Sequence, residues 1–343
     1  MHYDAIPKIN EDIKRTKRAI IGLGCSFVEG HGAIDQYIWD TYHKPGDNED
    51  YCSWQLDSQV VKELITKFPD LEKQIVGSGP IRFINHENNN SFTSVLAKKY
   101  FNNEYAAINL GRRGNGNRAT IRDLYYYPEI LWDKLEEIIV IFCPSGAERF
   151  DFIDDTTHAV NNHNRWRTMW PNAHDAGPPI TTLWEAYRDT VWSDKFEILE
   201  AISNVQELLT WCKWKKAKLV IVPAFMRYYN RPTFIKKINQ TITKDFTNLN
   251  FIHRTITRTL NKEVYDAVDM WPWDNMFYPD EYPTFVDLCM AQEKSLDWKE
   301  GPNFYSFLRY GTPDKWITPC GHPSVKGHDL FAKLLYKHIT ENL

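Results

Sequence analysis

The fold is decided by the stretch RAIIGLGCSFVEG, from Arg18 to Gly30. Its first six residues, Arg18 to Leu23, form a mainly apolar run that ends at a glycine-rich turn, which predicts a buried strand. The turn is no dinucleotide fingerprint, because position 27 is Phe where a third Gly is needed. Ser26 on such a turn is suited to nucleophilic attack, since nearby backbone N–H groups can face a developing oxyanion. The alternative is that Ser26 only caps the following helix.

Further apolar runs alternate with helical patterns along the chain. Strands are predicted at 105–110, 138–143 and 219–222. Helices are predicted at 59–68, 91–101 (with Ser91 as its cap), 119–127, 195–213 and 324–339. Such alternation predicts a parallel sheet covered on both faces. Ligands bind outside the carboxyl ends of these strands, so candidate chemistry is expected after Leu23, Leu110 and Cys143.

Charge and hydropathy exclude several classes of protein. The 343 residues carry 41 basic and 45 acidic side chains, a formal charge of −4, which argues against a chain built to coat nucleic acid or an anionic membrane. No apolar run approaches the roughly 20 residues of a membrane span, and the charged N-terminus has no signal-peptide core. The six cysteines have no paired spacing and are interpreted as reduced thiols. We expect a protein that is cytoplasmic on synthesis and binds neither nucleic acid nor a membrane.

Aromatic residues are unusually frequent, at 14% of the chain. They are prominent in three segments interpreted as insertions, at about 31–90, 151–192 and 225–317. Rings at this density fill cores, and they also line clefts for sugars and other ligands. We interpret residues 1–343 as one α/β domain with these long, aromatic-rich insertions.

A second motif, NLGRRGNGN from Asn109 to Asn117, follows the second predicted strand. Its three glycines let backbone N–H groups approach a ligand and form an anion-binding concavity. A phosphate or nucleotide site is one alternative, because Arg112, Arg113 and Arg118 are close in sequence. The other is a turn needed only for chain reversal, with solvated arginines.

A third motif, CGHPSVKGH from Cys320 to His328, precedes the last helix. His322 lies on a loop, and a neutral imidazole is the usual general base for a Ser hydroxyl. The alternative is a surface histidine at a helix start, where Pro323 sets the entry and Ser324 caps the helix. His328 is expected on the helix face rather than in catalysis.

In order and content, these motifs resemble the SGNH (GDSL-type) hydrolase family. GCSFVEG resembles the nucleophile block, with Cys25 in place of the usual Asp, and NLGRRGNGN resembles the second block, which supplies an oxyanion-hole glycine. GHPSVKGH resembles the last block, which supplies the catalytic histidine. Phage-encoded members often have GCSF and HPS in this way. The resemblance covers about half of the chain and leaves out the insertions.

The resemblance implies a flavodoxin-like three-layer α/β/α sandwich with a parallel sheet of about five strands. It implies that Ser26 is the nucleophile and His322 the general base, with the backbone N–H groups of Ser26 and Gly114 facing the oxyanion. No cofactor and no metal is expected.

The sequence departs from the family in its third block, whose Asn donates to the oxyanion. The matching region, from Cys143 to Arg149, contains no Asn. Ser145, the N–H of Gly146 or Arg149 is a candidate substitute, with Asn117 as a more distant one. Losing one such donor costs about 10²–10³ in rate.

The second departure concerns the acid that orients the histidine. The family has Asp three residues before the catalytic His, and Pro319 occupies that position here. Asp314 is the nearest upstream carboxylate. A histidine in the wrong tautomer costs about 10⁴ in rate.

We therefore expect a serine esterase of SGNH type that cleaves a small or carbohydrate-linked ester, such as an O-acetyl group, through an acyl-enzyme. The alternative is a catalytically weak or inactive binding or structural protein of the same fold, assembled with virion proteins into a phage particle. Phosphate or nucleotide binding at Gly111 to Arg118 ranks below both.

Two other clusters have simpler explanations. A metal site would need the paired spacings HExxH or Cys-x-x-Cys, which are absent, so a polar insertion is expected where acids and histidines gather. Those residues are Asp151, Asp154, Asp155, His158, His163 and His174. Basic and aromatic residues at Trp211 to Lys216 and Arg165 to Arg167 can stack on bases, but a helix end and a loop explain them equally.

Overall fold

The protein is described by a computed structural model. It describes residues 6–31, 33, 66, 88–112, 114–127, 129–146, 149–153, 166–169, 182–183, 185–187, 194–225, 266–292, 316–317 and 322–343. Nearly all of the helix predicted at 59–68 lies outside these residues, as do Asp314 and much of the three predicted insertions.

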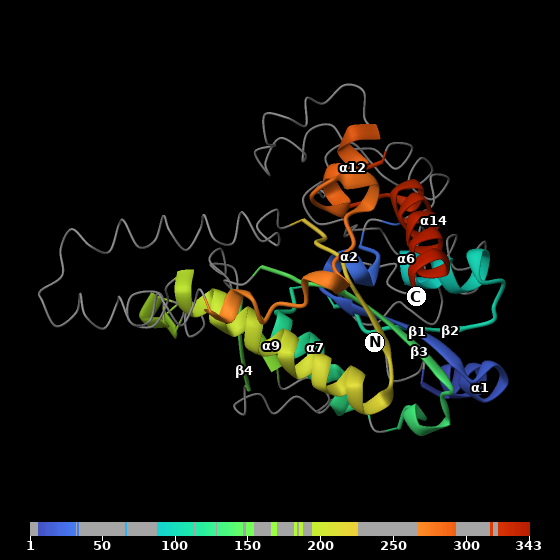
Figure 1. Cartoon of the computed structure of the whole chain (residues 1–343), viewed down its shortest axis with the longest axis horizontal. Coiled ribbons are helices and arrows are strands. Elements are labelled where there is room, and N and C mark those ends of the chain that lie inside the picture. Colours follow the sequence, from blue (N-terminus) through green and yellow to red (C-terminus); the bar gives the residue numbers. More distant parts are fainter. Residues whose placement is uncertain are drawn as a thin grey trace, which may run out of the picture.

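A parallel sheet forms the centre of the molecule, with the strand order β2-β1-β3-β6 (Figure 1). The strands are β1 (Arg18–Gly24), β2 (Ala106–Asn109), β3 (Glu137–Cys143) and β6 (Lys218–Ile221). All four confirm the strands predicted from the apolar runs. Met276 lies where a fifth strand of the sheet would run, because it pairs in parallel with Ile221 at the outer edge of β6. The order matches that of flavodoxin-like folds.

Helices cover both faces of the sheet, which confirms the predicted three-layer α/β/α architecture. One face carries α1 (Ile6–Thr16), α7 (Asn117–Tyr126) and α9 (Asp194–Lys215). The other carries α6 (Phe92–Val95), the π-helix η3 (Leu96–Tyr100), α12 (Phe285–Gln292) and α14 (Val325–Asn342). Ser91 caps α6 as predicted, its Oγ accepting from the N–H of Ser94.

Short elements complete the described part of the chain. They are α2 (Ser26–Glu29), the 3-10 helices η4 (Trp132–Lys134), η6 (Trp273–Asn275) and η7 (Pro279–Glu281), and the antiparallel pair β4 (Phe150–Ile153) and β5 (Trp166–Met169). The pair β4–β5 falls in the second predicted insertion, where no strand was expected. Residues 266–292 fall in the third, yet α12 and Met276 belong to the layers of the sandwich.

Alternation along the strands divides the apolar side chains into two cores. In β1, Ile21 and Leu23 face the core beneath α1, α7 and α9, whereas Ile20 faces the core beneath α6 and α14. In β3, Val140 faces the first of these cores and Ile139 faces the second. Since both faces are buried, the strands are nearly continuous apolar runs, which is why the sequence predicted them.

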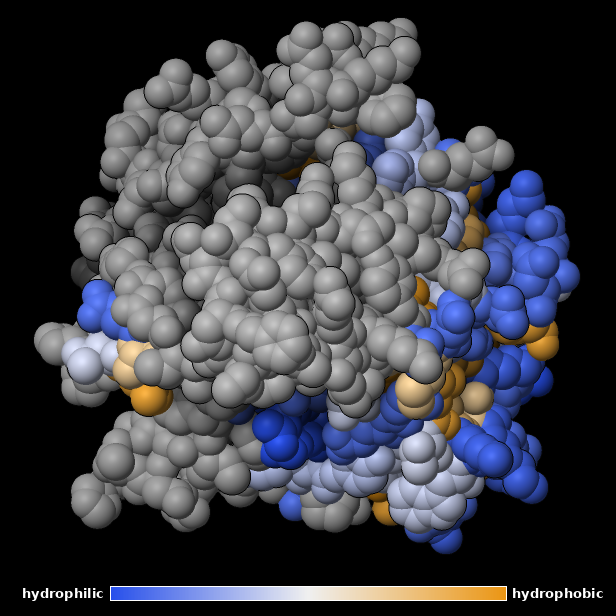
Figure 2. Space-filling model, turned by 60° about the vertical axis from the view of Figure 1, so that its left-hand side comes forward, coloured by the Kyte–Doolittle hydropathy of each residue, from blue (hydrophilic) through white to orange (hydrophobic). Residues whose placement is uncertain are grey.

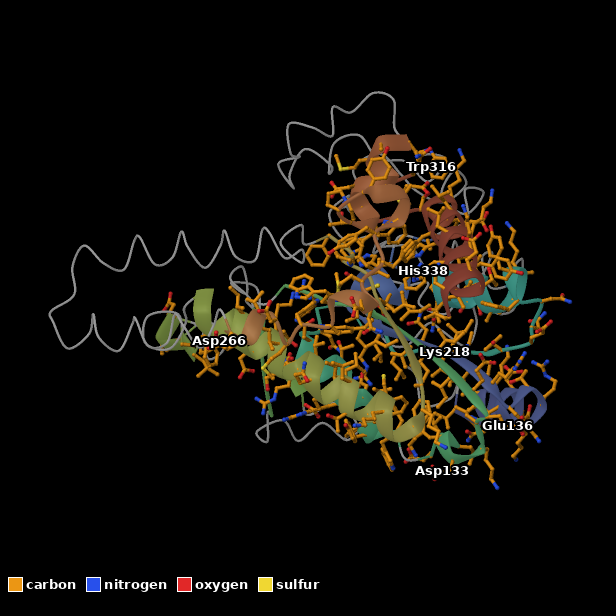
Figure 3. All side chains as sticks on the ribbon, in the orientation of Figure 1. Asp133, Glu136, Lys218, Asp266, Trp316 and His338 are labelled. Atoms are coloured by element: carbon orange, nitrogen blue, oxygen red, sulfur yellow. The ribbon has the colours of Figure 1, made fainter. Side chains whose placement is uncertain are left out.

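The surface and the amino-terminal edge of the sheet are polar. Figure 2 shows mainly hydrophilic described residues on one side, with separate hydrophobic ones between them. At the edge where β3 and β6 begin, Lys17 pairs with Glu136 at 2.8 Å and Lys218 with Glu137 at 3.1 Å (Figure 3). No helix among the described residues has the length and apolarity to cross a membrane.

His328 connects α14 to α6 inside the second core. Its Nδ1 accepts the backbone N–H of Phe92 at 3.1 Å, and its ring packs near Phe92 and Phe285. The side chain is fully buried. Burial, with a smaller contribution from the charge of His322, lowers the pKa of His328 to about 3. His328 thus lies on the helix face, as expected.

This burial predicts a pH-dependent stability. Because the folded-state pKa of His328 lies below the ordinary value of 6.5, the unfolded chain takes up the proton first and stability falls as the pH falls through 6.5. Between about pH 7.5 and about pH 5.5, the wild-type protein should lose about 1 kcal/mol more than His328→Asn, which keeps an acceptor for Phe92. Urea unfolding at both pH values measures the difference. Equal losses would contradict it.

Candidate active site

Ser26 and His322 meet at the carboxyl-terminal edge of the sheet. Ser26 is the first residue of α2, directly after β1, and its Oγ lies 2.7 Å from Nε2 of His322. The N-cap of α2 is Cys25, which makes no side-chain capping bond. The hydroxyl of Ser26 therefore faces the imidazole and does not cap the helix, so the capping interpretation is wrong.

The start of α14 holds His322 in place. Pro323 pairs with Ile317 in an antiparallel bridge, and the N–H of Ser324 donates to the carbonyl of Trp316 at 3.0 Å. Ser324 is the N-cap of α14, as predicted, and its Oγ accepts from the N–H of Gly327. His322 is half-buried at this helix start. The features expected of a helix entry thus fix the backbone that presents the imidazole to Ser26.

Two rings pack against the imidazole of His322. The ring of His31 stacks on it with a centroid distance of 4.3 Å, and that of Phe27 lies at 4.6 Å. His31 is buried, and its N–H donates to the carbonyl of Ser26 at 3.0 Å. Sequence reasoning missed His31. Its only signal was a position just past the short helix that follows Ser26.

The turn after β2 packs tightly against α2 and is held by a buried amide. The Asn109 Nδ2 donates to the carbonyl of Val28 at 2.7 Å and to Ser91 Oγ at 3.0 Å, and its Oδ1 accepts the N–H of Gly111 at 2.9 Å. A Cβ on Gly111 would lie 2.3 Å from the backbone nitrogen of Glu29. Glycine is therefore required at position 111, and Asn109 has a structural function that the motif alone did not indicate.

The oxyanion candidates fall into two groups. The backbone N–H groups of Ser26, Gly114 and Gly146 find no acceptor among the described residues. Gly114 has φ of 77°, a conformation that favours glycine. Asn117 and Ser145 instead bind each other: Asn117 Oδ1 accepts from the Ser145 N–H at 2.7 Å and from its hydroxyl at 3.2 Å, and Asn117 Nδ2 donates to the Ser145 carbonyl.

Of the arginines near this turn, Arg112 is held by partners within the described part of the fold. Arg112 lies 3.5 Å from the carboxylate of Asp123 and donates to the hydroxyl of Tyr127. Burial raises the pKa of Asp123 to about 6, against the opposing effect of Arg112. Arg112 is thus neither solvated nor directed at a ligand. Arg113 lies outside the described residues, and Arg118 is on α7.

Asp151, weighed above as a metal ligand, has a structural partner. From β4 it accepts the N–H groups of Gly116 at 3.3 Å and Ala119 at 2.8 Å, at the start of α7, and the hydroxyl of Thr168 on β5. Burial raises its pKa, and these donors oppose the rise. Within the part of the chain described here, no group of three or more potential metal ligands gathers. The other residues of that cluster lie outside it.

The basic and aromatic residues at the end of α9 also pack locally. Trp211 is buried, whereas Trp214 is exposed and has the ammonium of Lys215 at 3.8 Å from its ring centre. Lys215 also pairs with Asp133 at 2.5 Å. The helix-end explanation therefore accounts for these described residues.

Comparison with known proteins finds a similar solved structure but no similar sequence among family models or curated proteins. No family model matches the chain, and no curated protein matches it. A solved carbohydrate esterase is similar in structure, with a TM-score of 0.38 and 13% identity, over 95% of this chain and 69% of that chain. The architecture stated above rests on the strands and helices themselves.

The contacts of Asn109 predict a stability effect. Asn109→Ala leaves the buried N–H of Gly111 and the carbonyl of Val28 without their partner, so the free energy of unfolding should fall by about 2–4 kcal/mol. The matched control is Asn89→Ala, because Asn89 is exposed and accepts only from Lys98. The control should change stability by less than about 0.5 kcal/mol. Urea unfolding measures both, and equal small effects would contradict the assigned function of Asn109.

Proposed function

We propose that the protein is a serine esterase of the SGNH type, with Ser26 as nucleophile and His322 as general base. The observation that carries the proposal is the 2.7 Å contact between Ser26 Oγ and His322 Nε2. That distance is within the reach required for proton transfer between a nucleophile and its base. The contact lies outside the carboxyl ends of parallel strands, where such folds bind ligands.

The reaction is an acyl transfer in two stages. Ser26 Oγ attacks the ester carbonyl and its proton passes to Nε2 of His322, which requires the tautomer with the ring proton on Nδ1. The backbone N–H groups of Ser26 and Gly114 donate to the oxyanion, with that of Gly146 as a third donor. The imidazolium of His322 then protonates the alkoxy oxygen of the ester as its bond to the acyl carbon breaks, and the alcohol leaves. In the second stage water attacks the acyl carbon while His322 takes its proton, and that proton returns to Ser26 Oγ as the acid leaves.

The local packing suits this chemistry. Ser26 is 8% exposed, so little water competes for its hydroxyl. Phe27 and His31 restrict the orientation of the His322 ring, which keeps Nε2 directed at Ser26. The substrate class we assign is a small or carbohydrate-linked ester, and Asp314 is the candidate for the acid that orients His322.

Replacing either member of the pair should abolish hydrolysis. We expect Ser26→Ala and His322→Asn each to lower kcat/KM for p-nitrophenyl acetate by at least about 10³, and the double variant to lose no more than the singles. The control is Ser94→Ala, which removes another buried hydroxyl, on α6, where it accepts a hydrogen bond from Ser91 Oγ. Wild-type rates in Ser26→Ala would exclude Ser26 from the mechanism.

A covalent probe separates the esterase from a non-catalytic protein of the same fold. A fluorophosphonate labels a serine only when its hydroxyl is activated. The esterase requires labelling of Ser26 that disappears in His322→Asn. Absence of labelling in the wild-type protein would favour a binding or structural function.

We expect the ring of His31 to support catalysis by packing against His322 and not by its own acid–base chemistry. His31→Ala removes the ring that packs on His322, and misplacing the base by about 1 Å costs up to about 10² in rate. His31→Phe retains an aromatic ring, so its kcat for p-nitrophenyl acetate should stay within about fivefold of the wild type, whereas that of His31→Ala should fall by at least about tenfold. Equal losses in the two variants would show that the imidazole itself, not the packing, is needed.

A further inference from the structure

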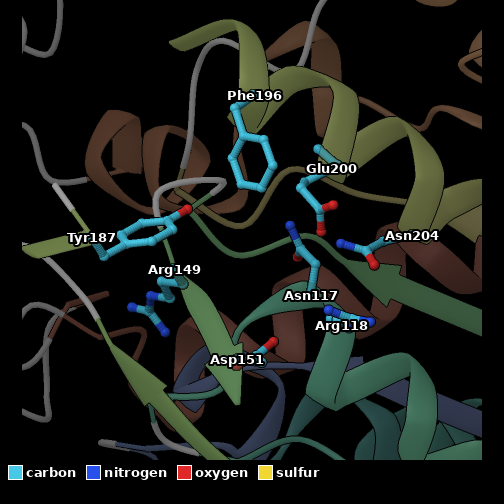
Figure 4. A pocket seen from close by; sticks show the side chains of 9 residues that line it. Asn117, Arg118, Arg149, Asp151, Tyr187, Phe196, Glu200 and Asn204 are labelled. Atoms are coloured by element: carbon cyan, nitrogen blue, oxygen red, sulfur yellow. The ribbon is translucent and has the colours of Figure 1, made fainter. Parts of the chain in front are cut away.

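A polar hollow lies beside the candidate active site, between α9, the start of α7 and the residues that precede β4 (Figure 4). It is a small hollow that opens to solvent. Phe196, Glu200 and Asn204 line it from α9. Their spacing of four residues places them on one face of that helix. Arg118 and Arg149 line it from the opposite side.

Three of the lining side chains have unused hydrogen-bonding capacity. Arg118, Glu200 and Asn204 make no hydrogen bond or ion pair among the described residues. Asn204 is only 9% exposed. Since Asn204 lines the open hollow, its amide is available to a ligand that enters there, and a ligand that satisfied both its donor and its acceptor would replace the water bound to them. By contrast, Asn117 in the same wall is bound to Ser145.

The chemistry of the lining indicates what kind of partner fits. Two guanidinium groups, Arg118 and Arg149, are balanced by the carboxylates of Glu200 and Asp151, so the hollow favours neither an anion nor a cation. Glu200 offers acceptors, Arg118 offers donors, and the amide of Asn204 offers both. Such a set suits hydroxyl groups, which donate and accept. Phe196, whose ring lies near that of Tyr187, provides an apolar surface against which a sugar face can pack.

A series of ring contacts connects this hollow to His322. The guanidinium of Arg149 lies 6.0 Å from the ring centre of Phe225, and Phe225 stacks on Phe27 at 4.8 Å. Phe27 in turn packs on His322. The hollow and the Ser26–His322 pair therefore lie at the same edge of the sheet.

We propose that the hollow is a binding site for a neutral, polyhydroxylated group, a sugar ring, that belongs to the substrate. Sugar binding there is independent of catalysis, whereas its assignment to the substrate rests on the proposed esterase function. Glu200 and Asn204 bind hydroxyl groups, Arg118 donates to further oxygens, and Phe196 packs on the ring face. The hollow thereby holds the carbohydrate part of the ester while the acyl carbon lies at Ser26.

The test measures binding in the full chain carrying Ser26→Ala, so that no turnover occurs. The probes are cellotriose, xylotriose and triacetylchitotriose, observed by saturation-transfer NMR. We expect transfer to at least one of them, reduced at least about fivefold by Glu200→Leu or by Asn204→Leu, since each removes a hydrogen-bonding group that binds the sugar. Glu207→Gln, on the same helix but outside the lining of the hollow, should leave the transfer unchanged.

The outcomes separate this inference from the proposed function. Transfer to none of the three sugars, or transfer unaffected by both hollow variants in correctly folded protein, would overturn the sugar site even if Ser26 hydrolyses p-nitrophenyl acetate. Transfer that depends on Glu200 and Asn204, together with an inert Ser26, would support the binding site and reject the esterase. Thermal unfolding of each variant establishes that it is folded.

Discussion

The hydrogen bond between Ser26 and His322 joins residues that are 296 positions apart, and the whole candidate site is arranged around it. It forms because the turn after β1 and the start of α14 lie at the same edge of one parallel sheet. In such a sheet every strand ends on the same side, so the turns after neighbouring strands come together. Gly24 of β1 pairs directly with Cys143 of β3, which brings the segments around Ser26 and Ser145 next to each other.

Buried amides hold these turns in place. Asn109 connects the turn after β2 to α2, and Asn117 connects the start of α7 to the turn after β3. Turns at the end of a sheet leave backbone groups without ladder partners, and buried groups of this kind must be satisfied. Both residues belong to NLGRRGNGN. Its glycines permit close approach, while its first and last asparagines supply the missing hydrogen bonds.

The need to satisfy buried polar groups also explains why several residues that resemble ligand-binding groups have structural functions here. Asp151 accepts the N–H groups at the start of α7, and Arg112 pairs with Asp123 beneath the turn. Each satisfies a buried partner that it meets only after folding. Arg118, Glu200 and Asn204 differ from them, because no described group occupies their hydrogen-bonding positions.

The sequence by itself determined the four strands, the caps Ser91 and Ser324, and the order of layers, because apolar periodicity and helix capping act over a few neighbouring residues. It also identified Ser26 and His322 as candidates through local motifs. Only the tertiary structure decided that these two side chains meet, that His31 packs on the imidazole, and that Asp151 caps α7 from an unanticipated hairpin. Those contacts join residues distant in sequence, and their geometry follows from how the layers pack rather than from any local pattern.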